Sequence, residues 1–272
     1  MVVAQSHITI VIYSMKTCAL ASGSSGNCFY IEHDKICFLI DAGISSRQII
    51  QRLESIGRRA AALSGIFITH EHIDHVRGVD ALARKFSLPV FLTRKCHAGC
   101  RDICSDETLV RHIEKDIELE FGGVQILPFS KNHDACDPVS YAITANGSKV
   151  SVMTDIGSVT ASVVNHLRNS NIVYLESNHD ISMLEQGPYP EYLKVRILSD
   201  RGHLSNLAAA RLVEEHGTAQ LKHLVLSHLS ESNNTRAIAL RTMKNQLASR
   251  IDLGRVVVSV SGRHEPTALM AA

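Results

Sequence analysis

The stretch THEHIDH, Thr69–His75, decides how this sequence is interpreted. It follows an apolar segment that predicts a buried strand. Three imidazoles this close together would depress one another's protonation, and a metal ion held by the neutral rings accounts for bringing them together. In a loop, His70 and His72 can point to one ion. Asp74 and His75 can then point to a second. A solvated polar loop or a helix cap is the alternative.

Further ligands must come from distant parts of the sequence, because this stretch alone cannot fill the coordination of two ions. Three candidates follow predicted strands: His133 in KNHDACDPVSY, Asp155 in VMTDIG and His228 in LVLSHLSESNN. Asp155 can bridge two ions through its two carboxylate oxygens. Taken alone, His133 or His228 would also fit an ordinary cleft or core histidine, and their place after a strand favours the ligand role.

Composition bounds the kind of protein. The chain has 272 residues, 45% of them hydrophobic and 20% charged, with a formal net charge of +1. These values exclude a disordered, collagen-like or low-complexity chain. No apolar run approaches the roughly 18 to 20 residues of a membrane span, so we expect no membrane partner. No linker or charge run divides the chain, so we expect a single domain over residues 1–272.

The two ends of the chain are expected to contribute little to the fold. Residues 1–14 lack the basic start of a signal peptide. Met15 fits a translation start, in which case residues 1–14 are a non-native or disordered extension; a real extra strand is the alternative. Residues 263–272 are expected to form a flexible tail.

The seven cysteines are an odd number in a chain with no export signal, which predicts reduced thiols in the cytoplasm. Cys96, Cys100 and Cys104 would share one face of a helix. Buried small hydrophobes are the better interpretation, because a zinc site built on consecutive helical turns has poor geometry and no CxxC pair is present.

Apolar runs alternate with amphipathic stretches along the chain, which predicts an α/β fold with large sheets and outer helices. The expected strands are Cys18–Ala21, Cys28–Glu32, Ile36–Ile40, Gly65–Thr69, Val90–Thr93, Ile117–Glu120, Val124–Pro128, Ser140–Ala145, Lys149–Thr154, Ile172–Glu176, His223–Ser227 and Val256–Ser261. The expected helices are Ser46–Ile56, Val76–Phe86, Thr160–Arg168, Ser205–His216 and Asn234–Leu247. An Asp and a His follow strands in each half of the chain, and such residues usually line a shared cleft.

The candidate ligands and their surrounding motifs, taken in their order along the chain, resemble those of the metallo-β-lactamase superfamily from about Thr17 to Gly262. The resemblance implies an αββα sandwich with a dinuclear metal site at one edge of two packed sheets. The strings LASGSSGN, IDAG, THEHIDH, HDACDPVSY, SNHD, GPYP, GHLSN and LSHLSESNN are together similar to the WalJ (YycJ) group, whose members are regarded as exonucleases. Ile73 departs from this pattern, since a small polar residue is commoner there.

The resemblance also implies roles for the candidate ligands. His70, His72 and His133 would hold the first ion. Asp74, His75 and His228 would hold the second, with Asp155 between the two. Asp41 would orient a ligand or the loop from behind. All ligands are nitrogen or oxygen, which fits zinc and manganese equally. Two such ions activate a bridging hydroxide as the nucleophile, and Asp74 would be essential to catalysis.

Several polar residues are candidates for binding substrate. His203 precedes a predicted helix that begins at Ser205, and a helix start beside a histidine suits a phosphate; His203 could also protonate a leaving oxygen. The alternative is a plain cap at Ser205 and an exposed histidine. For each of the remaining candidates, the alternative is a role in a tight turn or a helix cap. These candidates are Ser24, Ser25, Asn27, His179 and Asn233.

These donors favour a phosphodiester over a thioester or lactam. We therefore expect a phosphodiesterase acting on nucleic acid, most simply a 5′-to-3′ exonuclease on single-stranded DNA. A hydrolase of a small molecule, such as a cyclic phosphodiester, thioester or lactone, is the first alternative. A metal-binding protein without catalysis is the second, and the complete set of ligands argues against it.

Overall fold

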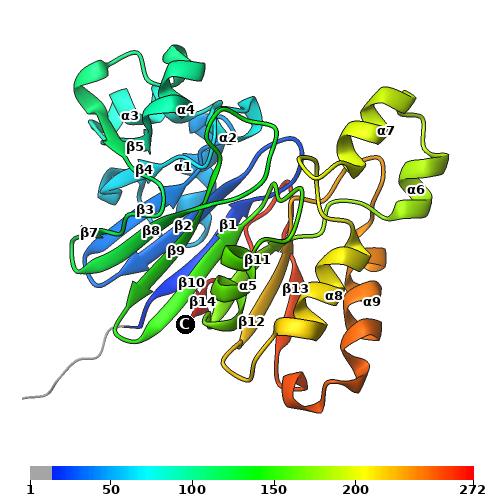
Figure 1. The fold of residues 1–272 in the computed structure, drawn as a ribbon. Helices are drawn as coiled ribbons and strands as arrows, with labels where there is room; N and C mark the ends of the chain where they lie inside the picture. The colour runs from blue at the N-terminus through cyan, green and yellow to red at the C-terminus, as the bar shows by residue number, and fades with distance from the viewer. Residues whose placement is uncertain (1–13) are drawn as a thin grey trace, which may run out of the picture.

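The apolar runs form two mixed β-sheets that pack face to face (Figure 1). The computed structural model describes residues 14–272, so the expectation for the N-terminal extension lies almost wholly outside the described residues. The first sheet has the order β14-β1-β2-β3-β4-β5-β6 and the second β13-β12-β11-β10-β9-β8-β7.

Within residues 14–272, strands of the first sheet are β1 (Lys16–Ala21), β2 (Cys28–His33), β3 (Ile36–Ile40), β4 (Gly65–Phe67), β5 (Val90–Thr93), β6 (Val110–Ile113) and β14 (Met270–Ala271). Strands of the second are β7 (Leu119–Phe121), β8 (Val124–Ser130), β9 (Val139–Ala145), β10 (Ser148–Met153), β11 (Ile172–Glu176), β12 (His223–Ser227) and β13 (Val257–Val260).

Helices cover the outer face of each sheet. Those near the first are α1 (Ser46–Ser55), α2 (Ile73–Val76), α3 (Val79–Phe86) and α4 (Arg94–Gly99). Those on the second are α5 (Ala161–Arg168), α8 (Asn206–His216) and α9 (Arg236–Gln246). Two more, α6 (Ile181–Gln186) and α7 (Glu191–Leu198), project to one side at the top of Figure 1. Short 3₁₀ turns complete the fold at Ala60–Ala62, Arg101–Ile103, Glu107–Leu109, Leu247–Ser249 and Ile251–Leu253.

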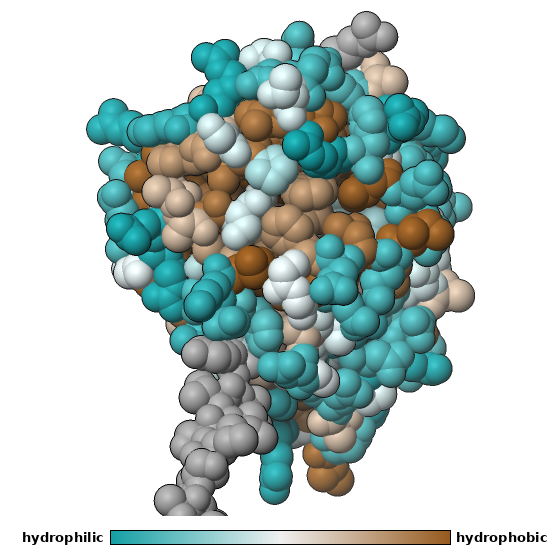
Figure 2. Space-filling view, turned by 90° about the vertical axis from the view of Figure 1, so that its left-hand side faces the viewer, coloured by the Kyte–Doolittle hydropathy of each residue, from teal (hydrophilic) through white to brown (hydrophobic). Residues whose placement is uncertain are grey.

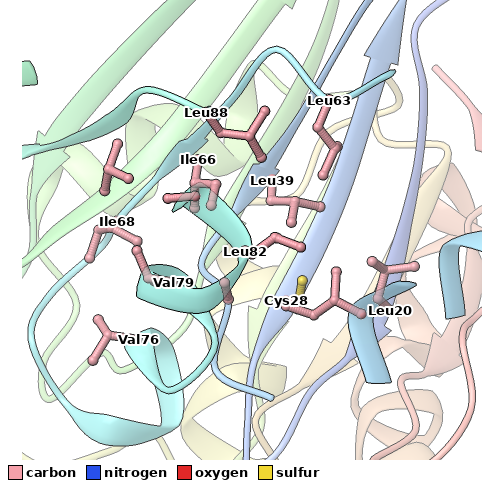
Figure 3. Close-up of a cluster of buried hydrophobic side chains, with 14 of the residues drawn as sticks. Leu20, Cys28, Leu39, Leu63, Ile66, Ile68, Val76, Val79, Leu82 and Leu88 are labelled. Carbon is pink, nitrogen blue, oxygen red and sulfur yellow. The ribbon is translucent and has the colours of Figure 1, made fainter. Parts of the chain in front are cut away.

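Three layers of apolar packing hold the four layers of structure together. Between the sheets, Phe29, Tyr141 and Tyr174 are almost completely buried. On the first sheet, Val79 and Leu82 of α3 pack in one cluster with strand residues such as Leu39 (Figure 3). A matching cluster joins the second sheet to α5, α8 and α9. This is the expected αββα sandwich, and each sheet buries both faces, which explains why its strands are almost continuously apolar.

The open end of the sandwich lies where β6 and β7 form the two sheet edges. Figure 2 shows this side of the molecule, with apolar side chains gathered in the middle of the face and hydrophilic ones around them. Strands here carry half-buried residues that pack against the inter-sheet core, among them Phe91, Ile113 and Phe121. No helix within residues 14–272 has the length and apolar character needed to cross a bilayer.

The structure corrects the expectation of a flexible C-terminal tail. Residues 270–271 form β14, an edge strand antiparallel to β1. Thr267 and Ala19 exchange two hydrogen bonds, from the Thr267 amide to the Ala19 carbonyl (2.9 Å) and from the Ala19 amide to the Thr267 hydroxyl (3.0 Å). The tail is ordered because it supplies hydrogen-bond partners to the backbone N–H and C=O groups along the edge of β1, which would otherwise lack them.

Two helix predictions also change. The predicted helix Val76–Phe86 is broken at Gly78, whose amide donates to the Ala42 carbonyl at 2.8 Å and where a Cβ atom would lie 2.2 Å from the Ile44 carbonyl oxygen. The cysteine helix is wrong in extent, because α4 ends at Gly99. Its interpretation as small core residues is confirmed for Cys96 and Cys104, which are buried in the first apolar cluster.

Candidate metal centre

The candidate ligands meet at one edge of the sandwich because most of them follow the carboxyl ends of strands. Asp41 follows β3, Asp155 comes two residues after β10, and His228 follows β12. All three have left-handed backbones, with φ of 60°, 57° and 55°. Such a conformation is uncommon outside glycine and collects at functional sites. Here it turns the chain sharply out of the strand, so the side chain remains at the sheet edge.

The first cluster consists of three imidazole nitrogens. The Nδ1 atom of His72 lies 3.0 Å from Nε2 of His70 and 3.3 Å from Nε2 of His133. The other ring nitrogen of His133 donates to the Gly202 carbonyl (3.2 Å), and that of His70 lies 2.8 Å from the Thr69 hydroxyl, which itself donates to Asp41. Both outer nitrogens therefore carry the proton, and the inner ones present lone pairs to the same point.

The second cluster brings Asp74, His75, Asp155 and His228 together. The Nε2 atom of His75 lies 3.4 Å from Asp74 Oδ2 and 3.2 Å from Asp155 Oδ2. The Nε2 atom of His228 lies 3.4 Å from the same Asp74 oxygen. Asp41, the predicted orienting residue, accepts from Nδ1 of His75 at 2.6 Å, so the ring presents its Nε2 to the cluster.

Asp155 lies between the two clusters. One of its oxygens is 3.8 Å from Nε2 of His133 in the first cluster, and the other is 3.2 Å from His75 in the second. Oδ2 of Asp155 and Nε2 of His228 are buried and have no hydrogen-bond partner among residues 14–272. Unpaired buried polar atoms of this kind are costly, and a cation between them would supply the missing interaction.

Glu176, at the end of β11, was not a predicted site residue, yet it organises this edge of the sheet. Its Oε1 accepts from Nδ1 of His203 (2.9 Å) and Nδ1 of His228 (2.8 Å). Backbone amides of Asp155, Ile156 and Leu204 donate to the same carboxylate. Its position as the last residue of a predicted strand was the available signal, because Asp41 and Asp155 also lie at or just beyond a strand end.

Electrostatics differ between the clusters. Burial lowers the pKa of His70 well below its usual range and that of His133 to about 3, so both rings are neutral. Burial would also lower the pKa of His228, but Asp155, Asp74 and Glu176 raise it to about 10. Without metal, His228 of the second cluster is therefore protonated, and the neighbouring carboxylates stabilise its charge. Both clusters fit divalent cations, the first through lone pairs and the second through exchange of that proton.

A cavity of about 200 Å³ opens onto both clusters. It is lined by His72, Asp74, His133, Asp155 and His228 from the clusters, by Ser24, Asp134, Arg201, Gly202 and His203 from loops, and by Leu193, Arg196 and Ile197 from α7. A cavity of this size suits the end of a chain or a small molecule and leaves the clusters open to solvent on one side.

The predicted substrate-binding residues separate into two groups. Ser24 and His203 line the cavity. The others do not. Ser205 caps α8 by accepting from the Ala208 amide (3.1 Å), Ser25 is exposed at a turn, and the rest are buried behind the clusters: Asn27, His179 and Asn233. Asn27 supports the second cluster, with its Nδ2 atom 3.2 Å from Nε2 of His75.

A family model described as the beta-lactamase superfamily domain matches residues 37–229. The chain belongs to the β-lactamase superfamily. Exodeoxyribonuclease WalJ of Streptococcus pneumoniae serotype 2 is 38% identical over 239 residues, covering 86% of this superfamily member and 88% of WalJ. Exodeoxyribonuclease YycJ of Bacillus anthracis is 35% identical over 85% and 88% of the two chains. The similarity to the WalJ (YycJ) group is thereby confirmed.

Solved structures show the same fold for this β-lactamase superfamily chain. The metallo-β-lactamase fold protein YhfI from Bacillus subtilis superposes with a TM-score of 0.69 at 16% identity, covering 93% of this chain and 99% of YhfI. A diphosphatase of the PhnP family superposes with a TM-score of 0.67 at 17% identity, covering 95% and 98%. The predicted metallo-β-lactamase fold is confirmed.

Proposed function

We propose that this chain is a metal-dependent exodeoxyribonuclease that cleaves phosphodiester bonds from the 5′ end of single-stranded DNA. The observation that carries the proposal is the pair of adjacent clusters joined by Asp155, open to one cavity. The names of the two relatives, which are exodeoxyribonucleases, support DNA as the substrate class. Two divalent ions, zinc or manganese, fit the all-nitrogen and oxygen ligand set.

His70, His72 and His133 would hold one ion, and Asp74, His75 and His228 the other, with Asp155 shared. Bound there, such ions lower the pKa of a water molecule and neutralise charge on the phosphate. The chain supplies the remaining chemistry. Asp41 and Glu176 fix the ring orientation of His75 and His228 by accepting from their Nδ1 atoms.

His203 is placed to hold a proton for the leaving oxygen. Its Nδ1 donates to Glu176 at 2.9 Å, and the ring lines the cavity. When both ring nitrogens are protonated, Nε2 is the donor left to meet the departing oxygen, as general acid catalysis requires. Ser24, on the opposite loop, would contribute a hydroxyl to the phosphate.

The test is nucleotide release from 5′-labelled single-stranded DNA with Mn²⁺, comparing the unaltered protein with Asp74→Ala. We expect release only by the unaltered protein, because Asp74 contacts both histidines of the second cluster. Thermal unfolding should show that Asp74→Ala still folds, since the side chain lies on the short helix α2 and belongs to none of the apolar clusters. No release by either protein, with hydrolysis of a cyclic phosphodiester or thioester instead, would replace this proposal by the small-molecule alternative.

We also propose the cytoplasm as the location. All seven cysteines within the described residues are unpaired thiols, and unpaired thiols are typical of reducing compartments.

A further inference from the structure

Helix α7 forms one wall of the cavity but supplies no ligand to the metal clusters and no proton donor to the leaving oxygen. Leu193, Arg196 and Ile197, spaced as neighbours on one helical face, line the cavity. No side chain of α7 is fully buried, and Tyr192 is 76% exposed. Only Leu193, Lys194 and Ile197 of this helix are half-buried, so packing does not explain its exposed groups.

Tyr192 lies one helical turn before Arg196, so the ring and the guanidinium are neighbours on the surface of α7. The charges of this region are sorted by position. Arg196 and Arg201 line the cavity, whereas the acids of the same segment, Glu185, Glu191 and Asp200, do not. Arg196 is paired with Asp134, which also lines the cavity, whereas Arg201 has no carboxylate partner among residues 14–272. The rim above the clusters therefore offers two guanidinium groups, one of them unpaired, beside an exposed aromatic ring.

The position of α7 is fixed by its connections to the metal-ligand loop. The Asp134 amide donates to the Arg201 carbonyl (3.0 Å), and Arg196 Nε donates to the Asp134 carboxylate (2.9 Å). The Gly202 carbonyl at the end of the same segment accepts from His133 (3.2 Å). A molecule resting on α7 is thus held in a fixed relation to the first cluster.

We propose that α7 is the platform for the DNA strand beyond the scissile phosphate: the nucleobase next to the cavity stacks on Tyr192, while the adjoining phosphate meets Arg196 and Arg201. This inference rests on the proposed function. Aromatic stacking beside basic side chains is how proteins hold single strands without reading their sequence. The charge fits a phosphodiester backbone, and the platform is continuous with the cavity that receives the strand end.

The kinetic test compares Tyr192→Ala and Tyr192→Phe with the unaltered protein on two substrates in Mn²⁺. One is a ten-residue oligothymidylate, and the other is the p-nitrophenyl ester of thymidine 5′-phosphate, which has no second base. Tyr192→Ala should raise KM for the oligonucleotide about 5- to 30-fold, the lower part of the range for one stacked base. Tyr192→Phe should restore it, and kcat/KM for the small ester should not change.

A spectroscopic test does not depend on turnover. The sequence contains no tryptophan, so Tyr192→Trp creates a single indole reporter. Combined with Asp74→Ala to prevent cleavage, its fluorescence should be quenched when oligothymidylate is added. The matched control is Ile251→Trp at another highly exposed apolar position (92%), in the 3₁₀ turn after α9, and its fluorescence should stay constant.

Each result decides the inference separately from the proposed function. Absence of DNA cleavage with clear quenching at position 192 would contradict the nuclease assignment and keep the platform. Cleavage with equal KM for Tyr192→Ala and the unaltered protein, or no quenching, would overturn the platform. If light scattering shows that Tyr192→Ala dissociates an oligomer while KM stays constant, the exposed side of α7 is a self-association surface and the inference fails.

Discussion

Replacing Glu176 by glutamine tests whether one buried carboxylate organises the metal centre. Glu176 accepts five hydrogen bonds, two from imidazoles and three from backbone amides. Glutamine has the same shape, but one of its two terminal atoms becomes an NH₂ donor. Oε2 receives two of the amides and Oε1 receives the other donors, so in either orientation the NH₂ group faces at least two donors.

The cost can be estimated from those lost partners. A buried donor left without an acceptor costs about 1–3 kcal/mol, so two of them cost about 2–6 kcal/mol. A domain has roughly 5–15 kcal/mol of stability in total, so Glu176→Gln should fold with reduced stability. At about 2–4 °C per kcal/mol, a loss near 3 kcal/mol lowers the Tm by roughly 6–12 °C. Loss of support behind His228 should also weaken metal binding about 10- to 100-fold.

Thermal unfolding followed by circular dichroism in EDTA measures the first effect, and calorimetric titration with Mn²⁺ measures the second. Glu120→Gln, at an exposed position on β7, is the matched control and should leave both unchanged. If Glu176→Gln unfolds at the original temperature and binds Mn²⁺ with unaltered affinity, the hydrogen bonds to this carboxylate do not hold the site together, and our account of its assembly is wrong.

Three further predictions follow from the structure. Metal-free protein should be most stable near pH 6.5. Burial lowers the pKa of His133 to about 3 and that of His166 to about 4, so stability falls as pH drops below about 6.5. Carboxylates raise the pKa of His228 to about 10, so the stability that its proton contributes is lost as pH rises toward 10; a Tm series in EDTA that rises steadily into acid would contradict this. Deleting residues 267–272 should cost about 2–4 kcal/mol, at roughly 1 kcal/mol per lost hydrogen bond to β1, and denaturant midpoints measure it; an unchanged midpoint would mean that β14 contributes nothing. Gly43→Ala should cost more than about 3 kcal/mol by overpacking, since its Cβ would overlap the backbone carbonyl of Asp74; a denaturant midpoint equal to that of the unaltered protein would refute that contact.

The sequence predicted most of the fold where strands are buried on both faces. The bounds of β3, β5, β11 and β12 match the predicted ranges, because each is a continuous apolar run. It did not predict β6, Val110–Ile113, whose two end residues are half-buried and whose two middle residues are exposed at a sheet edge. Helix α7 was missed for a related reason: it buries no side chain, so its sequence carries no amphipathic pattern.

The candidate site was predictable where ligands are close in sequence or follow a strand. The clusters bring together the seven predicted ligands. Glu176 was missed because its place at a strand end is a weak signal on its own, and its partners His203 and His228 approach only through folding. The polar loop residues Asn27, His179 and Asn233 were indistinguishable in sequence from cavity residues, since a buried polar group behind a site and one within it have the same composition.

The left-handed strand ends and the shared Asp155 have a consequence for the order of folding. Asp41, His72 and His75 come from the first sheet's half of the chain, whereas His133 and Asp155 come from the second. Neither half carries a complete set of ligands for both clusters, so the centre exists only when the two sheets have docked. Docking of this kind depends on contacts distant in sequence and is slow. With Co²⁺ in place of the native metal, the visible absorption of the bound ion should therefore appear with the slowest refolding phase. Metal binding would then report the time at which the two sheets complete their native interface.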